Sequence, residues 1–305
     1  MSSQVMVGLD IGGTKVDAVA IEADGRIIQR LRMPTGFGHD AVLETARAAV
    51  EQLSVLTGTA VTDFASIGIG IPGAVEEGTG RIAHSVNLGL ADFELGRSLG
   101  DLLGRSVRVE NDVNAAALGA FRLLEHGSSH SMAYLNLGTG LAAGLVLGGS
   151  LWRGSRGGAG EVGHIPVDPL GLQCPCGQRG CLETIGSGSA IARQWPTDDS
   201  RPASALFAAA VAGDPAAIEV RDRFISAVAS AIRMLVLTVD VDSVVIGGGL
   251  SSLGDDLLDR VVGVLREWEA ASPFLATIEL SARVQLVPSG FPAAAVGAAL
   301  VGTER

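Results

Sequence analysis

One histidine and three cysteines are spaced so that they could bind a metal ion. His164 ends the segment EVGH, and Cys174, Cys176 and Cys181 follow in a loop rich in glycine and proline. Three cysteines with one histidine form a donor set typical of closed, tetrahedral zinc sites. An odd cysteine count argues against paired disulfides, and three reduced thiols in a turn are the alternative. We therefore predict a structural Zn²⁺, with no open position for a substrate.

A glycine-rich turn near the start of the chain could bind phosphate. The motif DIGGTK spans residues 10–15 and contains Gly12 and Gly13. Glycines allow backbone N–H groups to approach phosphate oxygens, and Thr14 and Lys15 can donate hydrogen bonds. Asp10 could hold Mg²⁺, which prefers oxygen ligands. The spacing differs from that of a P-loop, and a plain hairpin turn is the alternative interpretation.

An acid flanked by amides lies where a predicted strand meets a predicted helix. The motif is ENDVN at residues 110–114, with Asp112 at its centre. A carboxylate at the carboxyl end of a strand in an open α/β sheet suits a general base acting on a sugar hydroxyl. Asn111 would orient the same sugar. The alternative is structural, since Asp112 is also a natural N-cap for the helix that follows.

The segments around these motifs predict alternating strands and helices. Apolar runs bounded by turn residues predict strands, and apolar residues at helical spacing predict helices. In the first part of the chain we expect strands at 5–9, 16–21, 26–32, 65–71 and 107–110, and helices at 39–56 and 113–124.

The pattern then restarts in the second part of the chain. Aligning LDIGGT at 9–14 with LNLGTG at 135–140 sets Asp10 against Asn136 and Gly12 against Gly138. Two such turns half a chain apart suggest a duplicated fold, and chance similarity is the alternative. The remaining elements expected are strands at 132–137, 141–147, 150–153, 243–246 and 284–287, and helices at 187–195, 203–212, 215–238, 254–271 and 292–301.

Composition and charge narrow the class of protein. The 305 residues are 47% hydrophobic and carry a formal net charge of −11, as in a globular protein without a basic surface. We therefore expect no nucleic-acid partner. No apolar stretch reaches the ~18 residues of a membrane span, and the first ten residues lack the pattern of a signal peptide. We expect a cytoplasmic protein with no membrane partner.

Six motifs, in order, resemble those of the ROK family. They are DIGGTK at 10–15, GIPG at 70–73, ENDVN at 110–114, LGTG at 137–140, EVGH at 161–164 and CPCGQRGCLE at 174–183. The resemblance runs from Asp10 to about Gly249. It implies an α/β, actin-like or hexokinase-like fold with two lobes, built from duplicated ribonuclease-H-like domains. We expect one lobe at 1–113 plus 292–305, and a larger, zinc-carrying lobe at 114–291.

The resemblance also implies a role for individual residues. The nucleotide and magnesium positions are matched by Asp10, Gly12, Gly13, Thr14, Lys15, Gly138, Thr139, Gly140, Gly247, Gly248 and Gly249. The sugar-contacting positions are matched by Gly73, Asn87, Asn111, Asp112, Glu161, His164 and Glu183. His164 is expected to touch the sugar with one ring nitrogen and zinc with the other, because its two nitrogens are distinct.

The activity implied is ATP-dependent phosphorylation of a hexose, with Asp112 as general base and Mg²⁺ as the second cofactor. Glucose is our first choice and glucose 6-phosphate the product; N-acetylmannosamine or N-acetylglucosamine is the runner-up, and fructose is less favoured. We expect a homodimer or homotetramer. Two rivals are a ROK transcriptional regulator and a sugar sensor without catalysis. The acidic charge and a strand that begins by Val5, leaving no room for a DNA-binding segment, oppose the first, whereas Asp10 and Asp112 oppose the second.

Two departures from the family pattern bear on the substrate. Ala142 and Ala143 follow Leu141 where further glycines are common, so the second phosphate turn has less backbone freedom. Leu90 stands where glucokinases often carry an aromatic residue after the position of Asn87.

Overall fold

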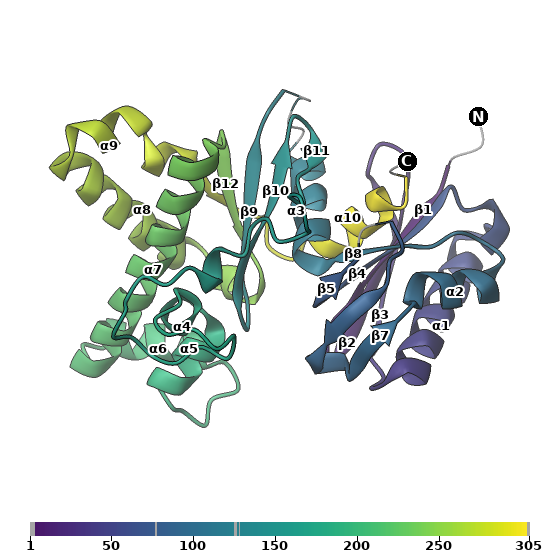
Figure 1. Cartoon of the computed structure of the whole chain (residues 1–305), viewed down its shortest axis with the longest axis horizontal. Coiled ribbons are helices and arrows are strands. Elements are labelled where there is room, and N and C mark those ends of the chain that lie inside the picture. Colours follow the sequence, from purple (N-terminus) through teal and green to yellow (C-terminus); the bar gives the residue numbers. More distant parts are fainter. Residues whose placement is uncertain (1–3, 77, 125–126, 128, 304–305) are drawn as a thin grey trace. The chain divides into compact units, whose positions relative to one another are not determined.

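The computed structural model describes residues 4–76, 78–124, 127 and 129–303 (Figure 1). The chain divides into two compact units. The first contains Met1–Ser129, Gly144–Ala159 and Pro292–Arg305, and the second contains His130–Ala143 and Gly160–Phe291.

The first unit is built on a five-stranded sheet of order β3-β2-β1-β4-β8. Its strands are β1 (Met6–Ile11), β2 (Lys15–Ile21), β3 (Ile27–Pro34), β4 (Ser66–Ile71) and β8 (Arg108–Asn111). The first three strands form an antiparallel meander, whereas β4 and β8 run parallel to β1. Because parallel strands end at the same edge, the turn after β1 and the junction after β8 lie at one edge of the sheet. The register aligns Asp10 with Gly70, and Gly70 with Glu110.

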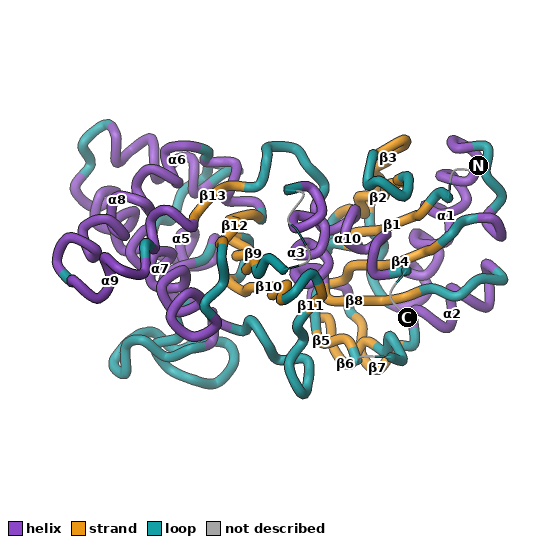
Figure 2. The backbone as a smooth tube through the Cα atoms, turned by 90° about the horizontal axis from the view of Figure 1, so that it is seen from above, coloured by secondary structure: helices purple, strands orange, loops and turns teal. Residues whose placement is uncertain are grey.

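Four longer helices belong to this unit: α1 (His39–Thr57), α2 (Leu95–Leu103), α3 (Asp112–Leu123) and α10 (Ala293–Val301). Figures 1 and 2 show α10 along α3, and it also packs on β1 and β4. The approach is close because it uses glycines: a Cβ atom at Gly297 would lie 1.6 Å from the carbonyl oxygen of Ala115. We expected 114–291 in the second lobe, but this packing places α3 in the first unit.

A small sheet, formed by the part of the chain between β4 and α2, was not predicted from the sequence. It contains β5 (Ala74–Val75), β6 (Ile82–Ser85) and β7 (Leu90–Phe93), with the 3-10 helix η2 (Val86–Leu88) between β6 and β7. Strands of two to four residues are too short to show a recognisable alternation, and α2 carries two glycines, Gly96 and Gly100, that weaken a helical pattern. A further 3-10 turn, η1 (Val61–Asp63), precedes β4.

The second sheet repeats the strand order of the first. It runs β11-β10-β9-β12-β13, formed by β9 (Met132–Leu137), β10 (Leu141–Leu147), β11 (Ser150–Leu151), β12 (Ser243–Gly247) and β13 (Val284–Leu286). As in the first sheet, the central pairings β12–β9 and β12–β13 are parallel. The correspondence confirms the duplicated α/β fold expected from the two glycine turns. The last part of β10 and all of β11 count with the first unit.

Helices make up most of the rest of the second unit. They are η3 (Val162–His164), α4 (Glu183–Gly186), α5 (Gly188–Gln194), α6 (Pro202–Val211), α7 (Pro215–Val239), η4 (Gly249–Leu253), α8 (Asp255–Ala271), α9 (Pro273–Ile278) and η5 (Leu280–Arg283). Both views show α7 and α8 on the side of β12 (Figures 1 and 2), and α8 also contacts β13. Asp214 caps α7 by accepting hydrogen bonds from the backbone N–H groups of Ala216 and Ala217. In the described part of the chain, no helix has the length and apolar character needed to cross a membrane.

Candidate active site and metal centre

The turn after β1 presents its backbone at the edge of the first sheet. The N–H of Gly12 donates to the carbonyl oxygen of Lys15 at 3.0 Å and closes the turn, while Gly13, Thr14 and Lys15 are exposed. A Cβ atom at Gly13 would lie 3.3 Å from Cβ of Asn87, so a residue from η2 lies against this turn. The first unit thus brings a predicted phosphate turn and a predicted sugar contact together.

At the junction between β8 and α3, the adjacent residues Asn111 and Asp112 have different roles. Oδ1 of Asn111 accepts hydrogen bonds from the backbone N–H groups of Val113, at 2.9 Å, and Asn114, at 3.2 Å. Asn111 is therefore the N-cap, and the alternative interpretation of Asp112 as the cap is wrong. The amide nitrogen of Asn111 donates to the carbonyl oxygen of Gly73 at 3.2 Å, so Gly73 and Asn111, both predicted sugar contacts, also touch each other.

Glu110 and Arg153 complete this junction, and neither was singled out from the sequence as a functional residue. Glu110 is buried, and its Oε2 accepts a hydrogen bond from Nε of Arg153 at 2.6 Å. Glu110 lies inside the ENDVN motif, so the sequence motif could have identified it. Arg153 lies far along the chain after β11, and only the tertiary structure brings it here.

The electrostatic environment at the end of β1 favours a cation. Burial raises the pKa of Asp10 to about 7, and the negative charges of Asp112 and Asp17 add to this, whereas Lys15 opposes it. Asp17 is already paired: burial alone would raise its pKa, but hydrogen bonds from Arg30 and Arg32, at 2.7 and 2.6 Å, lower it. A carboxylate held near another carboxylate in this way is a suitable ligand for a hard cation such as Mg²⁺.

The second glycine turn, after β9, is supported by a carboxylate. The N–H of Gly138 donates to the carbonyl oxygen of Gly140 at 3.1 Å. Oε2 of Glu183 accepts a hydrogen bond from the N–H of Leu141 at 2.8 Å, and a Cβ atom at Gly140 would lie only 2.5 Å from this oxygen. Glu183 was expected to contact sugar, and the structure gives one of its oxygens a role in holding the predicted phosphate turn.

The start of α5 lies directly against the same turn. The N–H groups of Gly188 and Ser189 donate to the carbonyl oxygens of Gly138 and Thr139, at 2.8 and 3.2 Å. A pocket of about 180 Å³ opens beside Gly188. It is lined by Gly188, Arg201, Pro202, Ala203, Ser204, Gly249, Leu250, Ser252 and Leu253.

Of the three glycines at 247–249, only Gly249 lines this pocket. Gly247 and Gly248 have a packing explanation, because Cβ atoms there would lie 2.0 Å from Oη of Tyr134 and 2.5 Å from the carbonyl oxygen of Leu137. The family resemblance singled out Gly249 but not the start of α6, whose residues reach the pocket from 45 or more positions earlier in the chain.

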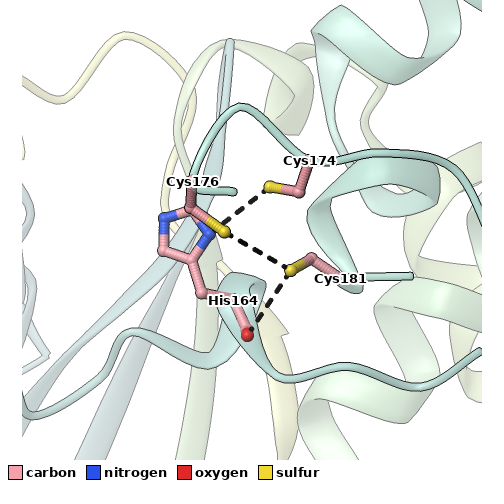
Figure 3. A group of neighbouring side chains, drawn as sticks. All are labelled: His164, Cys174, Cys176 and Cys181. Carbon is pink, nitrogen blue, oxygen red and sulfur yellow. Dashed lines mark hydrogen bonds between the residues drawn. The ribbon is translucent and has the colours of Figure 1, made fainter. Parts of the chain in front are cut away.

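The predicted zinc ligands converge in the second unit (Figure 3). Their four donor atoms all lie within 4.8 Å of one another. Sγ of Cys174 lies 3.8 Å from Nδ1 of His164, and the sulfur atoms of Cys176 and Cys181 are 3.7 Å apart. A Zn–S bond of ~2.3 Å in a tetrahedral site gives a separation of about 3.8 Å between ligand atoms. The donor set and its spacing therefore fit zinc.

Two of the cysteine thiols differ in how readily they ionise. Hydrogen bonds from the backbone and side chain of Gln178 lower the pKa of Cys176 to about 6, whereas burial and the neighbouring thiols raise the pKa of Cys181 to about 12. Thiolates are the metal-binding form, so a bound cation would offset the cost of ionising Cys181. Nε2 of His164 points away from the sulfur atoms (Figure 3). It lies 3.9 Å from a carboxylate oxygen of Glu161.

Comparison with known proteins gives one consistent result. A model of the ROK family matches residues 6–303. A glucokinase of Halalkalibacterium halodurans is 36% identical over 280 residues, covering 86% of this chain and 85% of the relative. An N-acetylmannosamine kinase of Citrobacter koseri is 33% identical, covering 90% and 92%. The crystal structure of a ROK family glucokinase from Streptomyces griseus, in complex with glucose and AMPPNP, aligns with a TM-score of 0.81 at 30% identity over 98% of this chain and 99% of that one.

Proposed function

The chain belongs to the ROK family, and from this we propose that it is an ATP-dependent sugar kinase that converts glucose to glucose 6-phosphate. Whole-length similarity to glucokinases supports this assignment. The structural observation that carries it is at the start of α3, where Asn111 caps the helix and Asp112, held by a hydrogen bond from the N–H of Val113 at 3.0 Å, follows it at the carboxyl end of β8.

Asp112 is the general base in this proposal. It accepts the proton of the attacking sugar hydroxyl while the phosphoryl group is transferred. Gly73, Asn87 and Asn111 hold the sugar from the first unit, together with Asp112 itself. Glu161, His164 and Glu183 are the sugar contacts that we assign to the second unit.

The nucleotide is held through backbone groups and one acid. Gly13, Thr14 and Lys15 donate to phosphate in the turn that Gly12 closes, and Thr139 and Gly140 do so in the turn that Gly138 closes. Gly249 and its pocket accept the adenosine, with Gly247 and Gly248 shaping the approach. Asp10 holds Mg²⁺, which when bound neutralises charge on the phosphates.

Zinc has a structural role in this proposal. His164, Cys174, Cys176 and Cys181 fill a tetrahedral site and leave no position for a reactant. Bound through Nδ1, the imidazole of His164 keeps Nε2 for the sugar beside Glu161.

The runner-up substrate is N-acetylmannosamine, supported by the similarity to the kinase of Citrobacter koseri, or N-acetylglucosamine. A panel of hexoses and N-acetylhexosamines in a coupled ADP assay separates these alternatives, with NMR to locate the phosphate in the product. ADP release with none of the sugars would leave a non-catalytic sensor. Phosphate on the anomeric oxygen would overturn the proposed orientation of the sugar.

We further propose a cytoplasmic protein that forms a homodimer or homotetramer and does not bind nucleic acid. The net charge of −11 supports the last point, because it disfavours a phosphate backbone. Light scattering after size-exclusion chromatography measures the oligomeric state, and a monomer would contradict it.

A further inference from the structure

A buried ion pair lies directly behind the proposed base. Glu110 is 7% exposed, and its carboxylate accepts a hydrogen bond at 2.6 Å from Arg153, whose side chain is 17% exposed. We propose that Arg153 is a positioning residue for phosphoryl transfer, which acts through Glu110 to fix the junction that carries Asp112. The inference rests on the proposed function.

Glu110 holds the junction on both sides of Asp112. Its Oε1 accepts hydrogen bonds from the backbone N–H of Asn111 and from the side-chain amide of Asn114, each at 2.9 Å. These donors are the residue before Asp112 and the second residue after it. One carboxylate oxygen therefore determines where the first turn of α3 begins, and with it the position of the Asp112 backbone.

Arg153 keeps that carboxylate in place. A buried carboxylate without a cationic partner is strongly unfavourable, so without Arg153 the side chain of Glu110 would turn toward water. In doing so it would release the donors of Asn111 and Asn114. Glu110 lies beside Gly70 in the sheet, and Gly70 lies beside Asp10, so the uncompensated charge would also add to an edge that is already acidic.

The backbone around Arg153 is suited to this task. Its carbonyl oxygen accepts a hydrogen bond from the N–H of Ala159 at 3.2 Å, which closes the loop that begins after β11. The strand β11, two residues before Arg153, contacts α3 itself. The backbone that carries Arg153 therefore follows directly from a strand in contact with the helix that Arg153 positions. A lysine ammonium would restore the charge but not the planar geometry of the hydrogen bond.

The test compares Arg153→Met with a matched control in the same loop. Arg156 is exposed, and within the described chain no ion pair or hydrogen bond involves it, so Arg156→Met should behave as wild type. We expect Arg153→Met to lower kcat by roughly ten- to hundredfold, because a small misplacement of a catalytic group is costly. KM for glucose and for ATP should each change less than about threefold. Arg153→Lys should recover part of kcat.

A second variant separates positioning from loss of folding. In the double variant Arg153→Met with Glu110→Gln, the buried charge is gone and an amide oxygen remains to accept from Asn111 and Asn114. We expect this double variant to recover at least about a third of the wild-type kcat. An unchanged kcat in Arg153→Met, or a loss that appears only in KM, would overturn the proposal.

The junction can also be followed without turnover. The side-chain amide NMR signals of Asn114 should shift in Arg153→Met and return in the double variant. Signals that do not move would refute the positioning even if the protein proved inactive as a kinase. Absence of wild-type turnover on every sugar of the panel would instead refute the proposed function, with the NMR result still deciding the role of Arg153.

Discussion

At the scale of single residues, neighbouring side chains at the start of α3 differ in role: Glu110 and Asn111 hold the backbone, and Asp112 is the proposed base. Asn111 accepts hydrogen bonds from two N–H groups of the first turn, and Glu110 accepts one from the backbone N–H of Asn111. Asp112, the next residue, accepts a hydrogen bond from the N–H of Val113 at 3.0 Å but is not the N-cap. This division is the reason that a conservative change at Asp112 should affect chemistry far more than folding.

We therefore expect Asp112→Asn to fold and bind sugar but to lose activity. Removing a general base lowers kcat by ~10²–10⁴-fold, while the amide keeps the size of the side chain. Steady-state kinetics and a sugar titration measure both quantities, with exposed Asp101→Asn on α2 as the control. Near-normal kcat in Asp112→Asn would end its assignment as the base.

Asp10 should lower stability at high pH. Its pKa is raised to about 7 in the folded protein from an ordinary value of 3.8, so folding favours the protonated form. The contribution of Asp10 to stability is therefore greatest near pH 4 and is lost as the pH rises through about 7. Without added magnesium, Asp10→Asn should raise Tm by several degrees more at pH 8 than at pH 4, as thermal unfolding would measure. An equal effect at both pH values would contradict the burial of this charge.

At the scale of elements, residues 165–181 form a metal loop without a regular helix or strand. This loop contains isolated bridges, from Pro166 to Cys181 and from Gln173 to Arg179, and backbone hydrogen bonds such as the one from the N–H of Val167 to the carbonyl oxygen of Gly180 at 2.8 Å. Long elements elsewhere bury apolar faces, whereas this loop is mostly exposed and is ordered by such hydrogen bonds. A bound ion would add to that order by linking η3 to the cysteines.

We expect one zinc per chain, and we expect Cys176→Ser to lower zinc content, Tm and sugar affinity together. The sugar effect follows because the ion orients His164 next to Glu161. Elemental analysis, thermal unfolding and a sugar titration give the three values. Leu170→Ser, at a position 90% exposed in the same loop, is the control. Absence of tightly bound metal in protein produced with adequate zinc would refute the site.

Sequence patterns predicted long elements well and short ones poorly. The periods of α1, α7 and α8 extend over many residues, so their bounds were predicted within two residues. The strands β5–β7 escaped detection because they are too short to show a period. The motif at 110–114 located Asp112 but could not reveal Arg153, whose partner lies 43 positions away. Nor could it show that Asn111, and not Asp112, would cap the helix, since both residue types are good caps.

At the scale of the whole molecule, the two five-stranded sheets have the same strand order, but each unit is made of segments that are not continuous in the chain. The helix α10 follows the entire second unit in sequence and then packs on α3, β1 and β4 of the first. Its fit depends on glycines at the points of contact. The last helix is therefore part of the core of the first unit.

Two glycine substitutions should have opposite effects. In α10, Gly297→Ala should lower the free energy of unfolding by a few kcal/mol, roughly as overpacking does, because its Cβ would collide with backbone of α3. In α8, Gly263→Ala meets no atom within 4 Å and should raise it by about 0.5–1 kcal/mol through helix propensity. Denaturant unfolding compares them, and a stabilised Gly297→Ala would contradict the packing of α10.

The place of α10 in the chain also has a consequence for synthesis. A ribosome releases residues 130–291 before it makes α10, and at ~5–20 residues per second this takes roughly 10–30 s. During that interval the first unit lacks the helix that covers β1 and β4, and by its end the second unit has all of its segments. We therefore expect the nascent chain to complete its two halves in reverse order, with an uncovered apolar sheet that chaperones would recognise until translation ends.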